Sequence, residues 1–87
     1  MEQRVSENTV EIGEDVDVEV VFDEDGMPIG AIVDDLIVAT SADGTVVDET
    51  IDVLDADGNV VLEDEIVSVY DADGQLIESE ETITAID

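Results

Sequence analysis

Four short motifs of carboxylates and glycine recur along the chain and are its best-placed residues for chemistry. They are Asp23-Glu24-Asp25-Gly26, Ser41-Ala42-Asp43-Gly44, Asp55-Ala56-Asp57-Gly58 and Asp71-Ala72-Asp73-Gly74. Carboxylate oxygens at close spacing are the ligands that hard cations such as Ca²⁺ prefer in proteins. The candidates for weak binding of a hard cation are the carboxylates of the two most regular copies, Asp55, Asp57, Asp71 and Asp73.

The two regular copies resemble the middle of an EF-hand calcium loop, which runs D-x-[DN]-x-[DN]-G. With Gly58 at the sixth position, Val53 occupies the first position and Asp64 the twelfth, where the family has Glu. The copy at Gly74 also lacks the first ligand, because Val69 stands there. The flanking segments favour strands instead of helices, so the family's sites do not carry over. We interpret these Asp residues as turn builders, with cation binding as the alternative.

The residue types used by most catalytic sites are missing. The chain has no His, Cys or Lys, so the usual general base, thiol nucleophile and Schiff-base amine are absent. Paired carboxylates alone support glycoside hydrolysis, but that reaction needs a substrate cleft. Phe22 and Tyr70 are the only aromatic residues available to line one. We expect no catalytic residue and no cofactor, and we expect that the protein is not an enzyme.

The charge balance indicates a salty environment. Twenty-seven acidic residues oppose a single cation, Arg4, which gives a formal net charge of −26. Such self-repulsion opposes a compact state unless salt screens it, and at about 1 M salt the Debye length is about 3 Å. At 44% hydrophobic residues, the chain is too apolar for disorder. The composition resembles proteins of salt-in halophiles, especially haloarchaea and their viruses; a supercharged design is the alternative origin.

The same composition argues against several partners. Without a basic patch the chain lacks the contacts that bind nucleic-acid phosphates, and anionic membranes repel it. It has no apolar run of membrane-spanning length and no signal-peptide pattern at its start. We expect protein partners or self-association, in a virion or in the cytoplasm of a salt-in halophile.

An internal repeat suggests how the motifs are positioned. Residues 50–65 align with 66–81 at an offset of 16, and 82–87 aligns with 66–71. Asp-x-Asp-Gly suits a type I turn followed by a residue with positive φ, the chemistry of a hairpin with a glycine bulge. Four glycines are therefore predicted to reverse the chain: Gly26, Gly44, Gly58 and Gly74.

Period-two alternation predicts strands between these turns. Val16 to Val20 alternates apolar and acidic residues, as does Ile51-Asp52-Val53, which indicates one apolar and one wet face. Pro28 belongs at an edge or a strand end. Asp34-Asp35 and Glu78 to Glu81 are expected to connect strands. The predicted strands are 16–22, 27–33, 36–40, 45–47, 50–54, 59–62, 66–70, 75–78 and 82–86.

The predicted fold is therefore all-β: an antiparallel meander of repeated β-hairpins, sandwich-like or barrel-like, with little or no helix. We expect a flexible N-terminal arm at residues 1–9. Residues 10–87 are expected to form a single β domain of about four degenerate hairpin repeats.

These observations favour a non-catalytic structural role. The first hypothesis is a small β module of a virion (a capsid or tail accessory) or of a similar assembly from a halophilic source. The second is a calcium-binding or regulatory module that uses the acidic turns. The third is an acidic mimic that occupies a basic partner protein.

Overall fold

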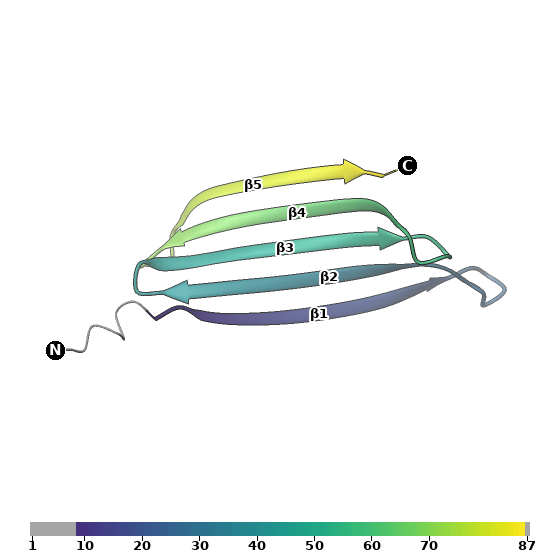
Figure 1. The fold of residues 1–87 in the computed structure, drawn as a ribbon, viewed down its shortest axis with the longest axis horizontal. Helices are drawn as coiled ribbons and strands as arrows, with labels where there is room; N and C mark the ends of the chain where they lie inside the picture. The colour runs from purple at the N-terminus through teal and green to yellow at the C-terminus, as the bar shows by residue number, and fades with distance from the viewer. Residues whose placement is uncertain (1–8, 87) are drawn as a thin grey trace.

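The computed structural model describes residues 9–86, which form five antiparallel strands in one sheet. Each strand pairs with the next along the chain, so the sheet is a meander in a single layer (Figure 1). No helix occurs among these residues. The prediction of an all-β hairpin meander is confirmed. The strands are β1 (Glu11–Phe22), β2 (Pro28–Ser41), β3 (Gly44–Leu54), β4 (Val60–Asp71) and β5 (Leu76–Ala85). Residues 1–8 of the expected N-terminal arm lie outside the described part.

The strands are fewer and longer than predicted, because acidic residues expected to connect strands lie inside them. β2 continues through Asp34 and Asp35, which pair with β1 on one side and β3 on the other. β5 likewise continues through Glu78 to Glu81. Alternating side chains point to opposite faces of a strand, so two consecutive carboxylates lie on opposite faces without leaving the sheet. Each strand from β2 to β5 therefore joins two of the predicted strands.

A bulge follows three of the four turns. Val21 pairs with Gly30 while Phe22 pairs with Pro28, which leaves Ile29 as the extra residue. The registers of the other two hairpins leave extra residues in the same way, at Val61 and Ile77. Pro28 is the first residue of β2, as its missing amide donor predicts.

The two faces of the sheet follow from the register, because directly opposite residues in an antiparallel sheet share a face. On one face, Asp17 lies in a row with Asp34, Ile51, Asp64 and Ile83; we name it the Asp17 face. On the other, Val18 lies in a row with Val33, Asp52, Glu63 and Thr84; we name it the Val18 face.

The expectation of one apolar face was wrong. Apolar residues of β1, such as Val18, lie on the Val18 face, whereas those of β3, such as Ile51, lie on the Asp17 face. The turn lengths set this register. In it, the apolar positions of β1 and those of β3 point to opposite faces of the sheet. Both faces therefore mix aliphatic and acidic side chains.

The sheet has no core. None of the residues 9–86 is buried, and large aliphatic side chains such as Ile12 and Ile83 are 70% and 62% exposed. The strand order places β1 and β5 at opposite edges. Residues 9–86 therefore do not form the expected sandwich-like or barrel-like closure and make one open layer. Across the same residues, no helix has the length and apolar character needed to cross a membrane.

Candidate functional site

The first Asp of each Asp-x-Asp-Gly motif organises its own turn. Asp55 Oδ1 accepts the backbone N–H groups of Asp57 and Asn59, both at 2.9 Å. The Gly58 N–H donates to the Asp55 carbonyl oxygen at 3.1 Å. The backbone N–H of Asn59, followed by other donors of the turn, holds the pKa of Asp55 below its ordinary value. The Asp55 carboxylate is therefore occupied by the turn.

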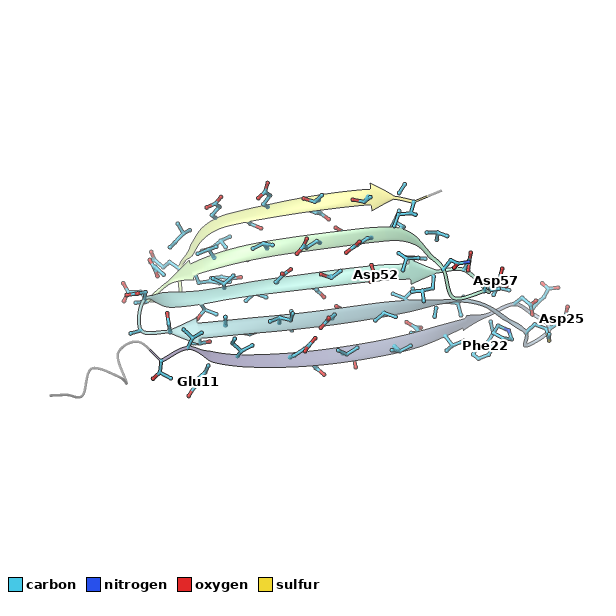
Figure 2. All side chains as sticks on the ribbon, viewed as in Figure 1. Glu11, Phe22, Asp25, Asp52 and Asp57 are labelled. Carbon is cyan, nitrogen blue, oxygen red and sulfur yellow. The ribbon has the colours of Figure 1, made fainter. Side chains whose placement is uncertain are left out.

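The same arrangement recurs in two other hairpins. Asp71 Oδ1 accepts from the N–H groups of Asp73 and Gln75 at 2.9 and 3.0 Å. Asp23 Oδ1 accepts two N–H groups of its own turn, each at 2.9 Å. Asp57 and Asp73 are exposed beside these turns, and Figure 2 shows Asp57 at the tip of its hairpin.

The structure does not bring the four candidate cation ligands together. Asp55 and Asp57 lie in the β3–β4 turn, and Asp71 and Asp73 lie in the β4–β5 turn. These turns are at opposite ends of β4, about 40 Å apart for a strand of this length. Within residues 9–86, no group of three or more acidic residues is arranged to hold a metal ion.

The four predicted turn glycines all have positive φ, at 83° for Gly26, 146° for Gly44, 87° for Gly58 and 86° for Gly74. The Gly44 turn differs from the rest, because Ser41 Oγ replaces the carboxylate and accepts the Asp43 N–H at 3.2 Å. A Cβ on Gly44 would also collide with the Tyr70 carbonyl oxygen. Gly44 therefore has two reasons to be glycine.

An acidic band crosses the middle of the sheet, and the sequence analysis did not identify it. Every strand contributes two consecutive acidic residues, one to each face. The acidic band consists of Glu14-Asp15, Asp34-Asp35, Asp48-Glu49, Asp64-Glu65 and Glu80-Glu81. The recurrence of such pairs at spacings of 20, 14, 16 and 16 residues is the signal that could have revealed it.

Neighbouring strands share carboxylate pairs inside the acidic band. A side-chain hydrogen bond with Asp35, reinforced by its charge, raises the pKa of Glu14. The pKa of Glu49 is raised by its hydrogen bond with Asp34. The remaining raised pKa values are those of Glu65, through Asp48, and of Glu81, through Asp64. Each pair holds a proton more tightly than isolated carboxyls would, because two adjacent like charges repel.

Several Asp residues on β2, β3 and β4 have one carboxylate oxygen that solvent does not reach. The Oδ1 atoms of Asp34, Asp35, Asp48, Asp52 and Asp64 are shielded from solvent and have no hydrogen-bond partner. Figure 2 shows Asp52 on β3, near the end of the strand that leads into the β3–β4 turn. A shielded, unpaired carboxylate oxygen is costly. The interior strands therefore carry a desolvation cost at these five Asp residues.

The surface between these charges is apolar and shallow. At the end of the sheet near Gly44, a hollow of about 330 Å³ is lined by Val10, Ala39, Val46 and Ile77, among others. A smaller hollow of about 180 Å³ lies at the opposite end beside Ile29. These open hollows offer contact area, and no arrangement of catalytic groups lies in them.

The chain was compared with protein families, curated proteins and solved structures, and no match was found in any of the three.

Proposed function

We propose that this chain is a non-catalytic structural module that works by associating with copies of itself, as a component of a virion or a similar assembly from a halophilic source. The observation that carries the proposal is the absence of any buried residue among residues 9–86. A compact domain of similar size buries about 60% of the surface of its unfolded chain. A sheet without a core gains that burial by contact with another chain.

The area available supports this role. Five strands of about eleven residues make a face of roughly 900 Å², taking about 3.4 Å per residue and about 4.8 Å between strands. A stable protein–protein interface buries about 800 Å² on each partner. One face of this sheet is thus large enough for such an interface, and both edge strands add unpaired backbone groups.

The turns favour the structural role over the cation-binding alternative. The carboxylates of Asp23, Asp55 and Asp71 each accept two backbone N–H groups, which fixes the hairpins. The acidic mimic is disfavoured by the expected medium, because concentrated salt weakens contacts between charged surfaces.

The mass of the chain in solution tests the proposal. In about 2 M KCl, where charges are screened, we expect a multiple of the 9.3 kDa chain mass by light scattering. At low salt, repulsion between chains of charge −26 is expected to shift the population toward monomer. A folded, monodisperse monomer at every salt and protein concentration would count against self-association.

The genomic setting tests the virion part separately. Genes for capsid or tail proteins beside this one are the expected finding. A setting among metabolic genes would contradict the virion role while leaving self-association intact.

A further inference from the structure

The outer edge of β5 lacks the protection found on β1. β1 carries five carboxylates in twelve residues. Charged side chains on an edge strand oppose pairing with another chain. In β5 the last carboxylate is Glu81, and Thr82 to Ile86 contains neither charge nor proline. The second half of β5 is therefore an uncharged, β-branched strand edge.

The second half of β5 also matches part of an interior strand. Thr82-Ile83 aligns with Thr50-Ile51 of β3 at twice the repeat offset of 16, that is 32 residues. β3 is bonded to a strand on each side, whereas β5 is bonded on one side only. The alignment replaces Asp52 of β3 with Thr84, so β5 has one charge fewer at this point. Within the described residues, a strand that partly matches β3 thus lies at an edge of the sheet.

The register identifies which backbone groups point outward. The Ile86 N–H donates to the Val61 carbonyl oxygen at 2.9 Å, so Ile86 bonds toward β4. Hydrogen-bonded and non-bonded pairs alternate along an antiparallel ladder. Glu81, Ile83 and Ala85 therefore direct their N–H and C=O groups away from β4.

We propose that two copies of the chain pair antiparallel through β5, about a two-fold axis at Ile83, to form one continuous sheet. Ile83 then lies opposite the partner's Ile83, and Glu81 lies opposite the partner's Ala85. An axis at Glu81 would instead place two carboxylates directly opposite, which is destabilising. The inference rests on the proposed self-association and places the contact between two copies at the β5 edge instead of at a face of the sheet.

Sedimentation equilibrium of the full chain in about 2 M KCl tests this pairing. Ile83→Glu places two carboxylates at the two-fold axis, and Ile12→Glu is the matched control on the β1 edge. Both side chains are largely exposed, at 62% and 70%, and both changes add one negative charge. We expect dimers of wild type and Ile12→Glu, and at least a ~10-fold higher dissociation constant for Ile83→Glu.

A second variant separates loss of pairing from loss of folding. Ala85→Pro removes an outward N–H and leaves the ladder to β4 intact, a position where an edge strand tolerates proline. We expect it to dissociate the dimer while the far-ultraviolet circular dichroism of the sheet is retained.

The outcomes distinguish this inference from the proposed function. Wild type that oligomerises, with neither β5 variant dissociating it, overturns the β5 surface alone. A wild-type chain that stays monomeric overturns both the β5 pairing and the proposed self-association. A mass that grows beyond the dimer with concentration overturns the closed two-fold pair, because open-ended stacking produces that behaviour.

Discussion

At the scale of single residues, glycines in different turns are required for different structural reasons. Gly58 has a positive φ of 87° but open space around its α-carbon, whereas Gly44 combines a positive φ with a close approach to the Tyr70 carbonyl. Conformation alone therefore limits substitution at Gly58. Conformation and sterics together limit it at Gly44.

Substitution of these two glycines by alanine should separate the two effects. We expect Gly58→Ala to lower the free energy of unfolding by about 1–2 kcal/mol, the cost of a left-handed L-residue. Gly44→Ala should cost more, because the added Cβ must displace backbone atoms of β4. Urea unfolding in concentrated KCl measures both. Equal losses would show that the close approach to Tyr70 relaxes freely.

The two Asp residues of one motif should also differ. Asp55→Ala removes the acceptor of two backbone N–H groups, whereas Asp57→Ala removes the same charge from the same turn. We therefore expect a lower urea midpoint for Asp55→Ala than for Asp57→Ala. If added calcium raised the urea midpoint of wild type but of neither variant, cation binding would replace turn formation as the explanation.

At the scale of strands, the acidic band places like charges diagonally across neighbouring strands, as where Glu14 lies opposite Ile37, two residues from Asp35. Cross-strand like charges destabilise a sheet. The four Glu residues with raised pKa values lie on β1, β3, β4 and β5, so every pair of neighbouring strands contains one such carboxyl pair. The sheet is thus expected to gain stability when these pairs are protonated.

The acidic band predicts a stability maximum at mildly acidic pH. The folded pKa values of these Glu residues lie above their ordinary value of 4.5, so their stabilisation is fully present below 4.5 and lost as pH rises through the folded values. Asp55 acts in the opposite sense, because its folded pKa lies below 3.8 and its contribution is lost as pH falls through that folded value. Thermal unfolding at fixed salt should show the maximum near 4.5. A thermal midpoint that falls steadily as the pH is lowered from neutral would contradict this predicted maximum.

A charge-removing pair of variants isolates one contact of the band. Glu14→Gln removes the carboxyl whose pKa is raised by Asp35, and Glu11→Gln removes a carboxyl from the same strand outside the band. At neutral pH we expect a larger rise in urea midpoint for Glu14→Gln, and a weaker dependence of its midpoint on pH. Identical behaviour of the two variants would show that only net charge matters.

The acidic band also shows what the sequence could and could not predict at this scale. Asp-Gly turn chemistry and Val/Ile alternation predicted hairpins, and the meander follows from them. The Asp34-Asp35 pair has the same composition as a polar connector, and only its pairing to strands on both sides shows that it belongs to β2. The relative phase of the apolar alternation in β1 and β3 could not be predicted either. Asp17 and Ile51 share a face only because of the register of both strands with β2.

At the scale of the whole molecule, stability depends on two large opposing quantities. The chain carries a formal charge of −26, and its described residues include no buried side chain to offset the repulsion. Backbone ladders between five long strands and half-covered aliphatic side chains supply the stabilisation. Both the monomer and the proposed dimer should therefore respond strongly to screening.

Salt titration tests whether screening is the mechanism. As KCl rises from about 0.1 M to about 3 M, we expect the thermal midpoint to climb, with most of the gain below about 1 M, where the Debye length has already fallen to about 3 Å. Midpoints in KCl and K₂SO₄ should coincide at equal ionic strength if charge screening dominates. Sulfate should give higher midpoints if exclusion from apolar surface dominates instead, because that effect depends on the ion and not on ionic strength. A midpoint that does not change with either salt would contradict the high-salt environment inferred from the composition.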